Sequence, residues 1–329
     1  MVTRVKTNEP VLYGFDPLLG FWGTPNIEEE IIYKEFGNKV VGIQQNACGN
    51  RDISYKPNGH LKSVVCLGGS HTWGGGIEAK FRYSNILREK IENPVINAGH
   101  CSLGLDQECL YILEKIKKYN PKVIIVEQYP WGVTRILNNY VNGYIKPKFS
   151  LSKDGGLKLK KVPKYARFKF IRKILGAFYA YKKELDEFRG GIDLKTNYRP
   201  LEDPIFMHWK YNHYDYMYAL VEQLAVVMRD HCKQENIHLI FALGAVLQQF
   251  EGSSPSELVD YDLPRKRLKT ILKRIGVEYV DMSNAMLKAH SAQDPVIFYD
   301  GHINEKGNRI FADVLQHEMK KRDWVCMKA

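Results

Sequence analysis

The chain has 329 residues, of which 44% are hydrophobic, and a formal net charge of +11. This composition excludes a disordered chain, and no apolar run approaches the roughly 20 residues of a membrane-spanning helix. The polar N-terminus lacks the apolar centre of a signal peptide, and the six cysteines match no zinc or redox spacing. We therefore expect one or two globular domains, a cytoplasmic location and no transmembrane segment.

Residues 1–61 precede the regular part of the chain. Two short stretches within them, Glu30–Tyr33 and Lys39–Gln44, predict strands. Turn-forming and aromatic residues fill much of the remainder. We expect these 61 residues to be an N-terminal extension that packs on a domain at 62–329, and we assign the extension no chemistry.

From residue 62 onward, apolar strands alternate with amphipathic helices. The expected strands are Lys62–Leu67, Pro94–Asn97, Pro121–Glu127, Ile237–Leu243 and Val277–Asp281. The expected helices are Phe81–Ile91, Asp106–Tyr119, Tyr216–Glu235, Pro264–Ile275 and Glu305–Lys321. This alternation predicts a five-stranded parallel sheet with right-handed crossovers, and so a three-layer α/β/α sandwich.

A segment at about 132–212 interrupts the alternation between the third and fourth strands. Apolar residues at helical spacing within Lys164–Phe188 predict a helical insertion. Residues 145–200 contain 16 basic and 5 acidic residues, which accounts for the whole net charge. We expect either a cap near the active end of the sheet that binds an anionic glycan, with nucleic acid not expected, or a solvated basic surface.

A candidate nucleophile follows the first strand. Gly68 and Gly69 allow a sharp turn, and Ser70 comes next. The carboxyl end of a parallel strand is where ligands bind in open α/β sheets. Exposed N–H groups at the start of a following helix would favour negative charge developing at this serine. The alternative interpretation is an ordinary glycine- and serine-rich loop.

The base and the acid that such a serine needs lie near the C-terminus, in Asp300-Gly301-His302-Ile303-Asn304. A serine hydroxyl is a weak nucleophile without a general base, and a carboxylate orients that base. We predict His302 as the base and Asp300 as the acid. His71 is the second choice for the base, and Asp281 is an alternative acid.

Three blocks resemble the SGNH/GDSL hydrolase superfamily and occur in its order. They are Gly68–Gly74, Ile96–Gln107 and Asp300–Asn304. The resemblance implies a flavodoxin-like strand order and ester hydrolysis through an acyl-serine intermediate. No phosphate-binding loop and no His-Glu-x-x-His motif is present, so we expect no nucleotide cofactor and no metal.

The resemblance also implies an oxyanion hole. Its donors would be the N–H of Ser70, the backbone N–H of Ser102 where the superfamily has glycine, and a side-chain amide after the third strand. The Gly-x-Asn-Asp that usually supplies this amide is missing. Gln128 is the amide that the sequence offers instead. Because one oxyanion donor is typically worth about 10²–10³ in rate, this departure bears directly on activity.

We predict from these features a serine esterase that hydrolyses a small acyl ester, with acetyl on a carbohydrate as the first choice. Two alternatives use other features of the same chain. An O-acyltransferase would use the same triad with a sugar hydroxyl as acceptor. A catalytically degenerate module would bind an anionic polymer through the basic insertion.

Overall fold

The structure is a computed structural model. It describes residues 2–4, 12–33, 38–55, 61–141, 143–175, 204–206, 212–252, 259–298 and 300–328. Within these ranges, no helix combines the length and the apolar character needed to cross a bilayer.

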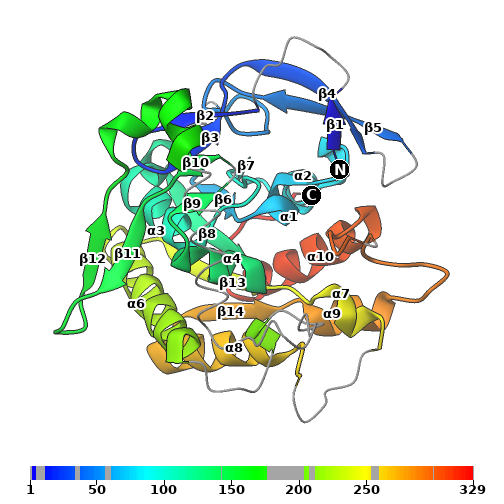
Figure 1. Ribbon diagram of the computed structural model, residues 1–329. Helices are drawn as coiled ribbons and strands as arrows, with labels where there is room; N and C mark the ends of the chain where they lie inside the picture. The colour runs from blue at the N-terminus through cyan, green and yellow to red at the C-terminus, as the bar shows by residue number, and fades with distance from the viewer. Residues whose placement is uncertain are drawn as a thin grey trace, which may run out of the picture.

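Five parallel strands form the central sheet, in the order β14-β13-β8-β6-β7 (Figure 1). The strands are β6 (Ser63–Leu67), β7 (Val95–Asn97), β8 (Pro121–Gln128), β13 (His238–Leu243) and β14 (Glu278–Asp281). Numbered along the chain, these strands lie in the order 2-1-3-4-5, which is the flavodoxin-like order. The predicted fold class is therefore confirmed, and each predicted strand lies within two residues of the observed one.

Helices cover both faces of the sheet, which makes three layers (Figure 1). One face carries α3 (Leu105–Glu114), α6 (Asn212–Gln234) and α8 (Leu263–Ile275). The other face carries α2 (Tyr83–Lys90), α9 (Ser283–Ala289) and α10 (Glu305–Lys321). Side chains alternate between the faces: Val65 and Leu67 point to the first layer, whereas Val64 and Cys66 point to the second. All four are fully buried, as a strand covered on both sides requires.

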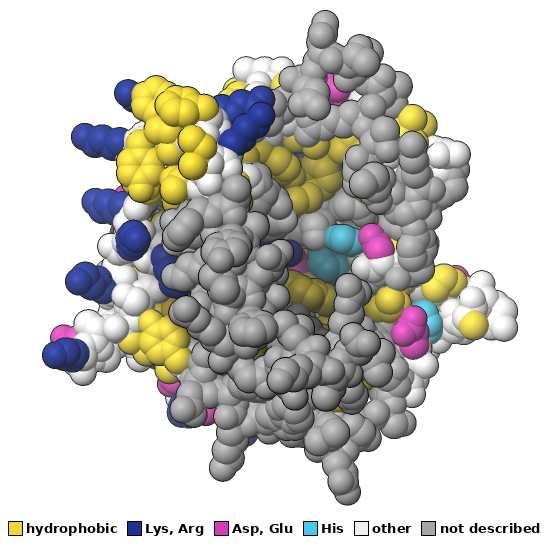
Figure 2. Space-filling model, viewed as in Figure 1, with side chains coloured by type: hydrophobic (Ala, Val, Ile, Leu, Met, Phe, Trp, Pro, Cys, Tyr) yellow, Lys and Arg dark blue, Asp and Glu magenta, His cyan; other side chains and the backbone are white. Residues whose placement is uncertain are grey.

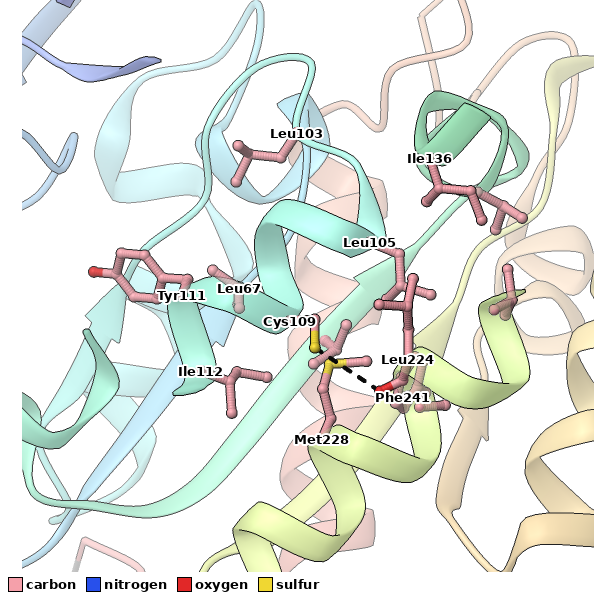
Figure 3. Close-up of a cluster of buried hydrophobic side chains, with 14 of the residues drawn as sticks. Leu67, Leu103, Leu105, Cys109, Tyr111, Ile112, Ile136, Leu224, Met228 and Phe241 are labelled. Carbon is pink, nitrogen blue, oxygen red and sulfur yellow. Dashed lines mark hydrogen bonds between the residues drawn. The ribbon is translucent and has the colours of Figure 1, made fainter. Parts of the chain in front are cut away.

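Figure 3 shows how the first layer closes over the sheet. Cys109 of α3 and Met228 of α6 meet above Leu67 and Phe241 of the central strands. The second layer depends on α10, whose predicted bounds are confirmed. Its first turn is capped by Asn304, the last residue of the third sequence block, whose side chain accepts from the N–H of Gly307 at 3.0 Å.

Some helix boundaries differ from the predictions. The helix expected at Asp106–Tyr119 is divided, because α3 ends before Lys115 and a 3₁₀ turn, η3 (Ile116–Tyr119), follows. Asn120 then takes a left-handed conformation with φ 46°, which stops the turn before β8 begins. The helix α6 begins four residues earlier than expected. Such end effects depend on local caps that apolar spacing does not reveal.

The N-terminal extension contains more strands than predicted. A three-stranded antiparallel sheet consists of β1 (Val2–Arg4), β4 (Ile27–Tyr33) and β5 (Lys39–Gln45). A hairpin consists of β2 (Tyr13–Asp16) and β3 (Gly20–Gly23). Ile31, Val41 and Ile43 from the small sheet form a buried cluster with Trp73, which lies just after Ser70 in the chain.

The insertion is helical only in part, which corrects the sequence prediction. It begins with α4 (Pro130–Thr134) and η4 (Arg135–Leu137). Two antiparallel pairs then follow, β9 (Tyr140–Val141) with β10 (Tyr144–Ile145), and β11 (Lys148–Leu151) with β12 (Leu157–Lys160). The leucines and lysines of β12 alternate with period two, which is the pattern of a strand. Within the predicted helix, Lys164–Arg167 is a 3₁₀ turn, η5, and residues 169–175 are helical, while 176–188 lie outside the described residues.

A buried ion pair fixes the insertion to the helix α3. Lys146 Nζ bonds the carboxylate of Asp106 in α3, and both side chains are completely buried. Basic side chains and an apolar patch from the later part of the insertion lie on the surface, at the upper left of Figure 2.

Candidate active site

The turn that carries Ser70 joins β6 to the short helix α1 (Ser70–Trp73). Gly68 is needed there for close approach, because a Cβ at this position would lie 2.4 Å from Thr72 Oγ1 and 2.5 Å from Glu127 Oε2. Gly69 has φ −82°, so a positive φ is not what the turn requires. The α1 helix ends at Gly74, whose φ of 85° favours glycine.

The N-terminal extension holds this turn in place through Arg51. Its Nη1 donates to the carbonyls of Trp73 at 3.2 Å and Gly74 at 2.6 Å, and its Nη2 donates to those of Gly42 and Ile77, each at 2.9 Å. Arg51 is only 1% exposed. A guanidinium with four carbonyl partners thus fixes the end of the helix that begins at Ser70, a role that the sequence did not indicate.

The second turn presents His302 from the loop before α10. An isolated antiparallel bridge joins Ile297 to Ile303, and the N–H of Phe298 donates to the carbonyl of His302 at 2.7 Å. Gly301 has φ 88°, which lets the chain reverse within the turn. Asp300 Oδ1 accepts from the backbone N–H of His302 at 3.0 Å, so the acid also fixes the backbone of the histidine.

The three predicted triad residues form a hydrogen-bonded chain, with His302 between Ser70 and Asp300. His302 Nε2 is 2.7 Å from Ser70 Oγ, and His302 Nδ1 is 2.8 Å from Asp300 Oδ2. Burial alone would raise the pKa of Asp300, but the hydrogen bond from His302, its charge and the backbone N–H outweigh burial and lower it. The carboxylate is therefore ionised at neutral pH and accepts from Nδ1–H, which directs the Nε2 lone pair toward Ser70. Figure 2 shows histidine and acidic side chains together in a hollow near the centre of this face.

The two alternative residues have other contacts. The His71 ring stacks on Tyr129 with centroids 3.7 Å apart and lies 4.9 Å from the His302 ring. Burial, with the charges of His302 and Arg135, holds the pKa of His71 well below its usual value, so the ring packs beneath His302 in its neutral form. Asp281 accepts from Arg265, and also from Lys269 and Ser283, at the end of β14.

The predicted oxyanion donors differ in their geometry. Ser102 has φ 65°, a left-handed conformation that normally favours glycine, the residue the superfamily has there. Gln128 is 2% exposed, and its Nε2 donates to the buried carboxyl of Glu108. Glu108 thus accepts from one of the two N–H groups of this amide, and Gln128 as an oxyanion donor stays a prediction.

Arg135, which the sequence analysis missed, lies at this edge of the sheet. Its Nη1 donates to the carbonyl of Leu103 at 3.1 Å and would lie 3.7 Å from a Cβ placed on Gly69, the neighbour of Ser70. Arg135 is in η4, seven residues beyond the end of β8. The only signal in the sequence was a basic residue soon after the third strand.

Glu127, near the end of β8, is a second polar residue that the sequence did not single out. Its Oε2 accepts from the N–H of Gly69 at 3.2 Å and from Thr72 Oγ1 at 2.9 Å. Burial raises the pKa of Glu127 to about 7, although these hydrogen bonds oppose the shift. Glu127 therefore ties the turn that carries Ser70 to the central strand of the sheet, and it can change its charge near neutral pH.

This shift predicts how stability depends on pH. Between the ordinary glutamate value of 4.5 and about 7, the unfolded chain has released a proton that folded Glu127 retains. The group's contribution to stability therefore falls as the pH rises through this window, and stays constant above it. Glu127→Gln removes the effect. The Tm of the variant minus the Tm of the parent should therefore be larger at about pH 8 than at about pH 5.

Differential scanning calorimetry at both pH values tests this prediction. The control is Glu235→Gln, which removes a surface carboxylate paired with Lys117 and should show no such relative gain. An equal Tm difference between Glu127→Gln and the parent at both pH values would show that Glu127 keeps one charge state throughout.

Comparisons with known proteins concern the fold. No family model matches the sequence, and no curated protein does. Among solved structures, a member of the lipolytic protein G-D-S-L family from Veillonella parvula is 12% identical, with 79% of this chain and 100% of that chain covered and a TM-score of 0.44. A GDSL-like lipase from Bacteroides thetaiotaomicron is 13% identical (82% and 93% covered, TM-score 0.43). The lipase/acylhydrolase from Enterococcus faecalis is 12% identical (82% and 100% covered, TM-score 0.44).

These neighbours are described with the superfamily name that the three sequence blocks suggested, but such low identities and TM-scores assign no activity to this chain. The strand order and the position of the blocks are features of the chain itself. Ser70 and Ser102 follow β6 and β7 at the carboxyl edge of the sheet, and Asp300 and His302 meet Ser70 there. The chain therefore has the α/β architecture that its resemblance to the SGNH/GDSL hydrolases implies.

Proposed function

We propose that the protein is a serine esterase that cleaves small acyl esters through an acyl-serine intermediate. The observation that carries the proposal is the continuous hydrogen-bonded chain from Ser70 Oγ through His302 to Asp300. A neutral serine, a histidine with its lone pair toward it and an ionised carboxylate behind are the groups that acyl transfer needs.

In the proposed reaction, Ser70 Oγ attacks the ester carbonyl carbon while His302 Nε2 takes the hydroxyl proton. The carbonyl π electrons move to oxygen and form an oxyanion, for which we propose the N–H groups of Ser70 and Ser102 as donors. Collapse expels the alcohol, which receives the proton from His302. Water then attacks the acyl-serine by the same proton route, releasing the acid and restoring Ser70. Asp300 stabilises the imidazolium in both halves.

For the substrate, we propose an acetyl ester of an anionic carbohydrate. Support comes from the insertion, where Tyr165, Phe168 and Phe170 are exposed. The Arg167 guanidinium lies over the Phe168 ring at 4.7 Å. Exposed aromatic faces can stack on sugar rings, and interspersed cations can pair with carboxylate or sulfate groups. We also propose that 1–61 and 62–329 act as the extension and the hydrolase domain.

The test is release of acid from p-nitrophenyl esters of increasing acyl length and from acetylated uronic-acid oligosaccharides. We expect the highest kcat/KM with acetyl and a decline with longer acyl chains. Transfer of acetyl to an added sugar with no release to water would favour the acyltransferase. If the oligosaccharide binds but is not turned over, and Ser70 is not acylated, the result would favour the degenerate binding module.

A further inference from the structure

We infer that Arg135 is a catalytic residue that binds the oxyanion formed when Ser70 attacks an ester. The inference rests on the proposed function and concerns a residue to which neither the sequence blocks nor the triad assign a role. It is carried by the position of the guanidinium between the two turns whose N–H groups are the other proposed donors.

The base and the guanidinium lie near different ends of the turn that runs from Gly69 to Gly75. A Cβ placed on Gly75 would lie 3.4 Å from His302 Cδ2, whereas one placed on Gly69 would lie 3.7 Å from Arg135 Nη1. An attacked carbonyl carbon at Ser70 must keep its leaving oxygen near His302, which returns the proton to it. The carbonyl oxygen then points away from the base, and we infer that it points toward Arg135 at the Gly69 end of the turn.

The guanidinium is held in this position by the loop after β7. Its Nη1 donates to the carbonyl of Leu103, next to Ser102. The stem of Arg135 packs closely on the same loop, because a Cβ on Gly104 would lie only 3.0 Å from Arg135 Cβ. Preorganised donors stabilise a transition-state charge best, since they need not reorient during the reaction.

The charge of Arg135 has no close counter-ion among the residues that the structure describes. No carboxylate there lies within 4.0 Å of its nitrogens. Two buried acids nearby, Glu108 and Glu127, have raised pKa values because of their burial, and so neutralise the guanidinium only in part. Burial lowers the pKa of Arg135 itself, but an arginine still remains protonated at neutral pH. Arg135 is partly exposed.

Arg135→Gln and Arg135→Lys test the inference with a neutral ester, p-nitrophenyl acetate. We expect Arg135→Gln to lower kcat by about 10²–10³ with KM nearly unchanged, as for loss of one oxyanion donor. Arg135→Lys keeps a positive charge and should retain more activity than Arg135→Gln. Methylboronic acid, which forms an anionic tetrahedral adduct with an active serine, should lose affinity for the variants in parallel with kcat.

The matched control is Arg274→Gln, which removes an exposed arginine paired with Glu222 in the helical layer and should leave kcat unchanged. Thermal unfolding shows whether each variant is folded. If Arg135→Gln does not fold, Arg135→Lys still tests the inference, because its kcat should fall while its KM stays unchanged.

Three results would overturn the inference. If the Arg135 variants lose activity only toward an anionic ester, Arg135 binds the negative charge of the substrate and not the oxyanion. If Arg135→Gln and Arg135→Lys are equally active, the charge of Arg135 is not needed, and its role is to hold the Leu103 loop through the hydrogen bond to that carbonyl. Unchanged kcat in both would remove any role. A parent chain that turns over no ester would instead overturn the proposed function, and the inference with it.

Discussion

Replacing Ser70 or His302 by alanine is expected to lower kcat/KM for small acetyl esters by about 10⁶-fold. Each substitution breaks the 2.7 Å contact between Ser70 Oγ and His302 Nε2, so neither attack nor proton transfer can proceed. Because the two residues act as a unit, the double variant should be no slower than either single one. Steady-state kinetics on p-nitrophenyl acetate measure all three.

Folding and specificity are controlled in the same experiment. His317→Ala removes an exposed histidine of α10 and should leave both kcat and Tm near those of the parent. His71→Ala tests the alternative base. If His71→Ala abolishes turnover in a folded protein while His302→Ala does not, His71 is the base and the assignment of His302 is wrong.

Asp300→Asn should lower kcat by about 10⁴-fold, less than the loss of Ser70. Asp300 accepts from two donors, the backbone N–H of His302 through Oδ1 and Nδ1–H through Oδ2. An asparagine that keeps the first bond with its carbonyl oxygen turns its NH₂ toward Nδ1. That arrangement forces the proton to Nε2, which can then no longer accept from Ser70.

The effect should be smaller than that of Ser70→Ala because the Asp300 side chain is 31% exposed, so water can partly take over its role. The kcat of Asp300→Asn is compared with that of Asp281→Asn, which removes the partner of Arg265 and Lys269 at the end of β14. We expect Asp281→Asn to lower Tm and leave the kcat of the folded protein unchanged. A silent Asp300→Asn together with an inactive Asp281→Asn would show that Asp281 is the acid.

The sheet, and the three residues of the proposed triad that the structure brings together, could be predicted from the sequence because both depend on short-range patterns. Continuous apolar runs in β6 and β8 mark strands that are buried on both faces. Ser70 and His302 are 232 residues apart, but each directly follows a turn signal next to a regular element. Once the strands are parallel, such turns meet at one edge of the sheet.

The residues that were missed are long polar side chains whose partners lie on other elements. Arg51 binds the end of α1 from the N-terminal extension, Glu127 reaches under the nucleophile turn, and Arg135 crosses to the loop after β7. Their positions depend on how α4 and the extension pack, which no local pattern encodes. The contact between the Gln128 amide and the buried carboxyl of Glu108 could not be predicted for the same reason, because Glu108 comes from α3.

The central claim, that Ser70 is an activated nucleophile, is tested most directly by labelling with a fluorophosphonate and mapping the modified peptide by mass spectrometry. Only a serine whose proton is taken by a positioned base reacts readily with such a reagent. We predict one label, on Ser70, that is absent after His302→Ala and after denaturation of the parent chain. A label on another serine, or none in a preparation that hydrolyses esters, would contradict the account.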